Sequence, residues 1–340
     1  MKIEKTTFAD EALKVRQSFT GGRKTRKHQQ ASSKVAADNG ADASEARVNV
    51  NIIPRIWLRD VEAQVREMRT FFTANSLPWD DNGWRIIPAD SYDSVMSTLD
   101  SMAIELDRLK ENVVKNWDQV KQNAYLKLGD LFDENTFPTQ GEFASAFQRE
   151  VEVEPIPASG HFTANVLTKA QNRIAEKLEQ RVALQLAAAH HDLWMRLSKA
   201  VSHACERLSA YSVDGDGRVS NKLYDSVITN LSDLVPVARS LNIADDAQLN
   251  KVVNDIERHL VKHPVGVLKN DDGLRKIVAK HASRINSDIL GESVKTLVDQ
   301  PWRVDPNLST SLGTAPEPEI VPEPDWRVDQ SGHFTASVTS

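Results

Sequence analysis

The sequence has one cysteine, few aromatic residues and no long apolar run, and each shortage excludes a class of protein. Cys205 is the only cysteine among the 340 residues, so the chain forms no internal disulfide and has no CxxC metal or redox motif. Aromatic residues make up 6% of the chain, which favours a core of Leu, Val and Ala side chains. The most apolar stretch, 182–189, is too short to span a bilayer, and the first residues lack the apolar segment of a secretory signal. We therefore expect an intracellular protein with no membrane segment.

Motifs that carry catalysis are also missing from the sequence. Neither a Gly-x-Ser-x-Gly nucleophile elbow nor a phosphate-binding Gly-x4-Gly-Lys-Ser/Thr loop occurs. Acidic residues alternate with Lys and Arg, as they do on solvated helix faces. His190 and His191 are adjacent on a predicted helix and point about 100° apart, which does not suit the binding of one metal ion. We expect solvated histidines there, no cofactor and no enzymatic activity.

The positive signal in the sequence is helical periodicity. From Val95 to Leu131 apolar residues recur every 3.6 residues on average, which is the period of an amphipathic α-helix. A second apolar stripe runs from Leu167 to Leu208 without Pro or Gly. Two such faces need to be covered, so we predict that the two long helices pack on each other as an antiparallel hairpin and bury Trp117 between them.

The remaining segments complete an all-α fold with a minor β element. Glu150-Val-Glu-Val-Glu154 alternates with period two between breakers and predicts a short strand. We predict a basic N-terminal arm and linker (1–50), a helical hairpin body (51–212) with a short β element near 149–157, a C-terminal helical domain (213–292) and an acidic, proline-rich, disordered tail (293–340).

Several short motifs follow one another in a defined order: Thr20-Gly-Gly-Arg-Lys, Leu77-Pro-Trp, Leu128-Gly-Asp-Leu-Phe, Pro155-Ile-Pro, Asp192-Leu-Trp and Leu241-Asn-Ile-Ala-Asp-Asp. In this order they resemble a family of tailed-phage and prophage proteins that has no established activity, over residues 18–290. Gly160-His-Phe departs from the Gly-Asp-Phe of that family. The resemblance implies a helical phage or prophage protein in the host cytoplasm, and it transfers no functional residue.

The basic N-terminal segment is the first candidate site. Arg16, Arg23, Lys24, Arg26 and Lys27 lie close together, and residues 1–30 hold eight bases against three acids. Such a cluster can neutralise phosphates, so one interpretation is contact with nucleic acid. The other is a plain solvated arm, because aromatic residues for base stacking are nearly absent and the whole chain has a net charge of −6.

The second candidate site is a partial calcium-loop pattern. With Gly217 at the sixth position, Asp214 and Asp216 fall on the third and fifth. The first and twelfth positions hold Ser212 and Leu223, so the strongest end ligands are missing. A glycine-rich turn between two helices explains the pattern equally well.

Two repeats mark the tail as a third candidate site. Residues 159–166 (SGHFTANV) recur at 331–338 with seven of eight identical, and residues 301–305 (PWRVD) recur at 325–329 (DWRVD). A duplication without a role is one interpretation. The other is that the tail copy docks through Phe334 and Trp326 on the kind of surface that holds the first copy, in the same chain or in another protomer.

These observations favour a non-enzymatic phage or prophage accessory protein. We expect it to act through protein contacts, with other phage proteins and with itself as a homo-oligomer, including coiled-coil pairing. The alternative is a DNA-metabolism factor that binds single- or double-stranded DNA through the basic arm. A third interpretation is a hydrolase whose site is assembled from scattered carboxylates.

Overall fold

The computed structural model describes residues 11–22, 24–157, 168–213, 218–298, 326–328 and 334–336. The chain divides into two compact units, 1–300 and 301–340. The described part is mostly helical with a small sheet, which confirms the predicted fold class in its coarse form. No helix in these ranges combines the length and the apolar character needed to cross a membrane.

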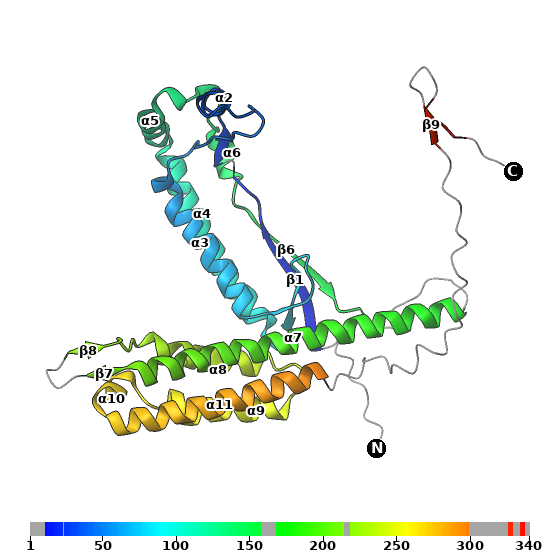
Figure 1. Ribbon diagram of the computed structural model, residues 1–340, viewed down its shortest axis with the longest axis vertical. Helices are drawn as coiled ribbons and strands as arrows, with labels where there is room; N and C mark the ends of the chain where they lie inside the picture. Colours follow the sequence, from blue (N-terminus) through cyan, green and yellow to red (C-terminus); the bar gives the residue numbers. More distant parts are fainter. Residues whose placement is uncertain are drawn as a thin grey trace. The chain divides into compact units, whose positions relative to one another are not determined.

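A four-stranded antiparallel sheet joins segments that lie far apart in the sequence. β1 (Ala12–Phe19) lies between β5 (Arg85–Pro88) and β6 (Arg149–Pro155), and β4 (Leu77–Pro78) pairs with β5 (Figure 1). The strand predicted at 150–154 is therefore confirmed as β6. The segment predicted as a basic arm contains β1, so Lys14 and Arg16 belong to a strand inside the sheet.

Opposite charges align β1 with β6. Lys14 lies across from Glu154 with 2.7 Å between its Nζ and the carboxylate, and Arg16 lies across from Glu152 at 2.6 Å. Both cations also lie over the ring of Trp84, 4.5 and 5.0 Å from its centroid. The two cations of β1 are thus matched within the sheet.

The remaining elements before β6 surround one hydrophobic cluster. α3 (Arg55–Ala74) and α4 (Ala89–Lys115) lie side by side (Figure 1). The other elements here are β2 (Thr25–Lys27), α2 (Gln29–Asp38), β3 (Asn49–Asn51), α5 (Trp117–Leu128), two 3₁₀ turns, η1 (Gly129–Leu131) and η2 (Glu134–Thr136), and α6 (Gln140–Ala144). The single helix predicted over 95–131 is interrupted at Asn116, which separates α4 from α5. At this point the side-chain amide of Asn116 donates a hydrogen bond to the carbonyl of Asn112.

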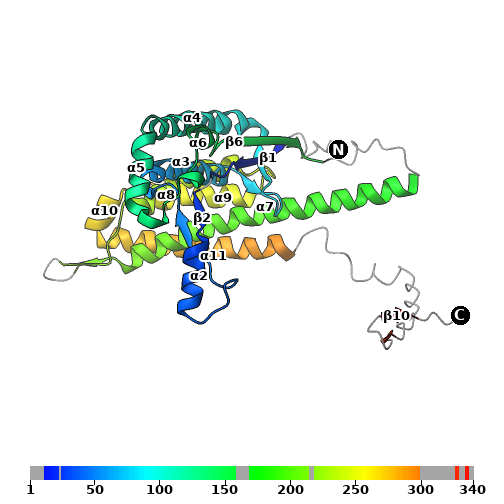
Figure 2. The same ribbon diagram turned by 90° about the horizontal axis from the view of Figure 1, so that it is seen from above.

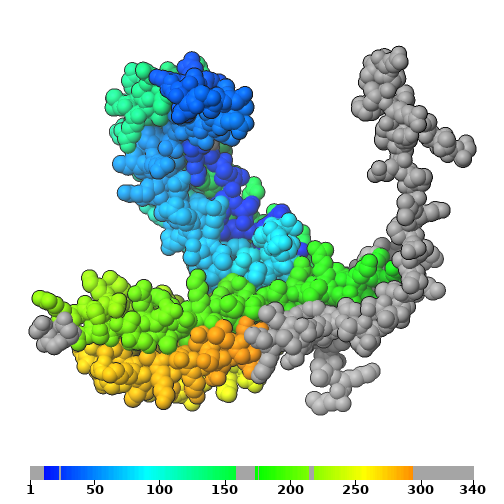
Figure 3. All heavy atoms as spheres, in the orientation of Figure 1, coloured from blue at the N-terminus to red at the C-terminus, as the bar shows by residue number. Residues whose placement is uncertain are grey.

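The second part of the unit is built around the longest helix. α7 (Thr168–Ala210) is followed by the two-residue strands β7 (Ser212–Val213) and β8 (Val219–Ser220), and then by α8 (Ser226–Ser240), α9 (Ala247–Ile256), a π-helical turn η4 (Glu257–Val261), α10 (Val265–Asn270) and α11 (Asp272–Val298). α11 packs along α7, and the N-terminal part of α7 runs past the end of α11 (Figures 1 and 2). In the space-filling view their green and orange atoms adjoin along the pair (Figure 3).

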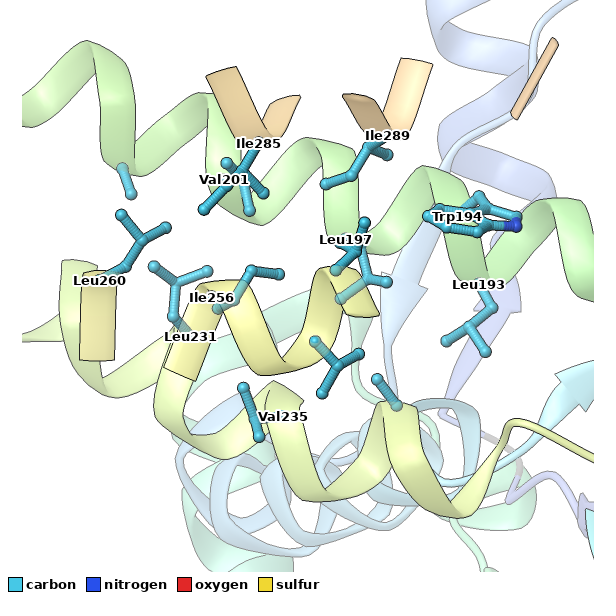
Figure 4. Packing of buried hydrophobic residues seen from close by; sticks show 14 of the residues in the cluster. Leu193, Trp194, Leu197, Val201, Leu231, Val235, Ile256, Leu260, Ile285 and Ile289 are labelled. Atoms are coloured by element: carbon cyan, nitrogen blue, oxygen red, sulfur yellow. The ribbon is translucent and has the colours of Figure 1, made fainter. Parts of the chain in front are cut away.

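The two long amphipathic helices do not pack on each other, so the predicted hairpin is wrong. Leu193, Leu197 and Val201 of α7 point toward residues of α8, α9, η4 and α11 (Figure 4). Trp117 is buried as predicted, but its ring packs on Phe137 and Phe143, with centroids 5.5 and 5.3 Å apart. An apolar stripe shows that a helix face must be covered, and it does not say which helix covers it.

The strand β5 separates the two hydrophobic clusters. Ile86 belongs to the cluster around α7, and its neighbour Ile87 belongs to the cluster of α3 and α4. Both side chains are fully buried. Because successive side chains of a strand point to opposite faces, one short strand contributes to two cores.

The second unit contains a short antiparallel hairpin. β9 (Trp326–Val328) pairs with β10 (Phe334–Ala336), with Trp326 opposite Ala336 and Phe334 opposite Val328. The hairpin therefore joins the tail copies of the two sequence repeats. The earlier copies, 159–166 and 301–305, lie outside the described residues, so docking of the tail copy stays a prediction.

Candidate binding groove

A groove with a volume of about 950 Å³ lies where the end of α3 meets α7 and α8. The last turns of α3 form one wall, α8 forms the opposite wall, and α7 contributes Arg196, Lys199, Ala200 and His203 between them. The small side chain of Ala200 keeps the floor low at this point. The larger apolar side chains of the lining are on the α8 wall, and its cationic side chains belong to α3 and α7.

The α8 wall exists because this helix is apolar over more than one face. Ile228, Leu231 and Val235 are buried in the cluster with α7. Val227, Leu234 and Val237 belong to the same cluster and also line the groove; Val227 is buried, whereas Leu234 and Val237 are only half-buried. The apolar face of α8 is therefore wider than its contact with α7 covers. Its half-buried edge, formed by Leu234 and Val237, is available to a partner.

Two arginine residues fix the end of α3 to α7. Arg196 of α7 donates to the carbonyls of Ala74 and Ser76 at 3.1 and 2.9 Å. Arg85 of β5 donates to the hydroxyl and carbonyl of Ser76 at 2.6 and 2.8 Å and to the carbonyl of Thr73 at 3.3 Å. The last carbonyls of a helix have no partner within it and carry partial negative charge, so two cations stabilise this end. We call Arg85 and Arg196 the arginine clasp.

The clasp stays charged although it is partly buried. Burial, with a contribution from the neighbouring Arg196, lowers the pKa of the Arg85 guanidinium to about 10. Asp192 acts in the opposite direction, and its carboxylate pairs with Arg196 at 2.7 Å. A pKa near 10 leaves Arg85 protonated at neutral pH. The wall that the clasp holds is therefore stable over the physiological range.

The rim of the groove is basic. Among its lining residues Arg69, Arg196 and Lys199 are cationic, and Asp233 is the one carboxylate. Arg69 lies over the ring of Phe19 at 5.2 Å. Within the described ranges neither Arg69 nor Lys199 forms an ion pair, and both are exposed. A segment that combines apolar side chains with carboxylates would match the apolar α8 wall and these cations.

The histidines of α7 were predicted to be solvated, and the structure corrects this for two of them. His190 Nε2 lies 3.1 Å from the carboxylate of Asp246, and burial lowers the pKa of its imidazole. His191 Nδ1 lies 3.1 Å from the hydroxyl of Ser293. Both are half-buried because other helices surround α7 here, and they tie it to α9 and α11.

The predicted nucleic-acid residues are distributed over several elements and are mostly paired. Arg16 pairs with Glu152, Lys24 with Glu62 at 2.7 Å and Arg26 with Asp133 at 3.8 Å. Lys27 is exposed on β2, and Arg23 lies outside the described residues. The alternation of Lys14 and Arg16 against the three glutamates of β6 was visible in the sequence and could have indicated the strand pairing.

The predicted calcium ligands Asp214 and Asp216 lie outside the described residues. In the part of the chain that is described, no group of three or more His, Cys, Asp or Glu side chains is placed to hold a metal ion. Cys205 is half-buried, with its Sγ 3.6 Å from the carbonyl of Ala279. No protein-family model, no curated protein and no solved structure matches this chain.

Proposed function

We propose that the chain is a non-enzymatic accessory protein of a phage or prophage, that it acts through protein contacts in the host cytoplasm, and that the groove of α3, α7 and α8 is its main contact surface. The observation that carries the proposal is the apolar α8 wall next to the basic side chains of α3 and α7. The order of the sequence motifs supports the phage assignment. The partner contributes a segment with an apolar stripe flanked by carboxylates.

The groove offers both affinity and orientation to such a segment. Leu234 and Val237 are half-buried, so a partner that covers them removes further apolar surface from water, at about 25 cal/mol per Å². Because the arginine clasp already holds the α3 wall, little ordering is needed at the moment of binding. The basic rim attracts carboxylates, which steers the encounter and fixes the direction of the bound segment.

A comparison of matched charge reversals tests the proposal. Lys199→Glu reverses one charge at the rim, and Lys177→Glu makes the same change at an exposed position elsewhere on α7. Tagged chains are expressed in infected or lysogenic cells, and the co-purifying proteins are quantified by mass spectrometry. We expect at least one partner to be lost from the Lys199→Glu chain and kept by the other two. The same set of partners with all three chains would refute the proposal.

The alternative of a DNA-binding factor has less support from the geometry. Arg16, Lys24 and Arg26 each face a carboxylate, so binding to a phosphate must compete with an existing ion pair. Exposed Lys27 is available, but one cation contributes little to affinity for a polyanion.

A further inference from the structure

The chain itself contains a segment with the chemistry that the groove requires. Residues 316–328 (PEPEIVPEPDWRV) hold four carboxylates and one arginine. Ile320, Val321 and Trp326 supply apolar groups between the charges. Trp326 lies in β9 and is one of the two tail residues predicted above to dock.

We infer that the occupant of the groove is segment 316–328 of a second copy of the chain. The inference rests on the proposed function of the groove as a protein-contact surface. It names the partner of that surface, and it makes the predicted homo-oligomer a consequence of groove binding.

The charges of the two surfaces are complementary. The rim presents Arg69, Arg196 and Lys199 against one carboxylate, and the segment carries a net charge of −3. Lys199 and Arg69 have no competing ion pair among the described residues, so a carboxylate that approaches them does not have to displace another. Exposed charge pairs of this kind are screened by salt, and binding should therefore weaken as the ionic strength rises.

The composition of the segment also reduces the entropic cost of binding. Pro316, Pro318, Pro322 and Pro324 each fix one backbone dihedral in the free segment as well as in the bound one. A segment restricted in this way loses less freedom when it is held in a groove. Trp326 is its largest apolar side chain and is the expected anchor, since aromatic anchors dominate binding energies at protein interfaces.

Exchange between two copies turns two weak contacts into one stable association. In a reciprocal pair each copy contributes one groove and one segment, which gives a closed two-fold arrangement with two identical contacts. After the first contact has formed, the second is intramolecular and benefits from a raised effective concentration. A pair of contacts that are each modest is then sufficient for a dimer.

The first experiment measures binding of the segment directly. A fluorescently labelled peptide with the sequence of 316–328 is titrated into a full-length chain that carries Glu317→Gln, Glu319→Gln, Glu323→Gln and Asp325→Asn, so that its own segment does not compete. We expect saturable binding by fluorescence anisotropy that weakens with added salt. Adding Lys199→Glu should weaken binding at least tenfold, whereas adding Lys177→Glu should leave it unchanged. A peptide with Trp326→Ala should also bind at least tenfold more weakly. Absence of peptide binding would overturn the inference.

The second experiment decides whose segment occupies the groove. Light scattering measures the mass of the unmodified chain over a dilution series, and we expect a dimer that dissociates on dilution. The chain with the four neutralised carboxylates and the Lys199→Glu chain should remain monomeric at concentrations where the unmodified chain is a dimer. If the peptide binds but the unmodified chain is monomeric at every concentration, the segment occupies the groove of its own chain and the inference is overturned. The co-purification assay is independent, so a partner lost only from the Lys199→Glu chain would uphold the groove's function even if the peptide does not bind.

Discussion

Replacing Arg196 by Met tests whether the arginine clasp holds α3 against α7. The substitution keeps the length and the apolar stem of the side chain and removes the guanidinium. The carbonyl of Ala74 then loses its bond to Arg196, whereas the carbonyl of Ser76 keeps its bond to Arg85 at 2.8 Å. Asp192 also loses its ion-pair partner, and because the paired oxygen, Oδ2, is buried although the rest of the side chain is partly exposed, this loss adds to the cost.

These changes give an estimate of the loss in stability. A hydrogen bond from a charged donor contributes about 1.5–3 kcal/mol net, and only one carbonyl is left without a bond to the clasp. Relief of the repulsion between Arg196 and Arg85 offsets part of this loss. We therefore expect the free energy of unfolding to fall by about 2 kcal/mol.

Urea unfolding followed by tryptophan fluorescence measures this change, and amide exchange over residues 72–78 locates it. Arg207→Met is the matched control, because Arg207 is an exposed residue of the same helix. Its Nε donates to Nε2 of His203 at 3.3 Å and makes no contact with the clasp. Exchange at the end of α3 should accelerate in the Arg196→Met chain and not in the control. An unchanged urea midpoint together with unchanged protection of these amides would refute the reasoning.

Three further predictions concern the core, the histidines and DNA. Trp117→Ala should lower the free energy of unfolding by about 3–5 kcal/mol, because a large buried ring that packs on Phe137 and Phe143 is removed, and a thermal midpoint close to that of the unmodified chain would contradict this. Burial lowers the pKa of His190. Burial, together with the stacked ring of His259 whose centroid is 4.5 Å away, lowers the pKa of His281. Below the ordinary pKa of 6.5 the unfolded chain therefore binds more protons than the folded chain. The free energy of unfolding should therefore decrease as the pH falls through 6.5. Urea titrations at several pH values should show a smaller decrease for a His190→Gln chain. An identical pH dependence in both chains would argue against a role of His190. For the DNA alternative, replacing Arg23, Lys24, Arg26 and Lys27 by Ala should flatten the slope of log K against log salt by roughly 0.7–0.9 for each phosphate that the arm no longer neutralises, and no binding by the unmodified chain at low salt would end that interpretation.

The sequence predicted where the long helices are better than how they pair. The stripe from Leu167 to Leu208 corresponds to α7, and the alternation at 150–154 corresponds to β6. The pairing of α7 with α11 and of α3 with α4 could not be read from periodicity, because every amphipathic helix presents the same kind of face. A solvated arm was one interpretation of the N-terminal charges, because the partners of Lys14, Arg16 and Arg26 lie more than a hundred residues away in the sequence.

The groove was not predicted, because a C-terminal helical domain over 213–292 does not say which apolar residues of its helices stay uncovered. One signal was available. Val227, Ile228, Leu231, Leu234, Val235 and Val237 cover more of the helix circumference than a single packing contact needs. The arginine clasp carried no local signal, because Arg85 and Arg196 meet at the carbonyl of Ser76 from positions that are far apart in the sequence.

The position of β5 between two cores has a consequence for how the sheet finds its alignment. A strand with one apolar face resists a shift by one residue, because the shift would expose that face to water. Ile86 and Ile87 are both apolar and both buried. A shift of β5 that put one of them in the place of the other would therefore not expose an apolar side chain at that position. The neighbouring pair of strands supplies what β5 lacks: a shift of β1 against β6 would place Lys14 and Arg16 opposite Val or Pro instead of Glu154 and Glu152. In the β1–β6 pair the alignment is thus specified by charge.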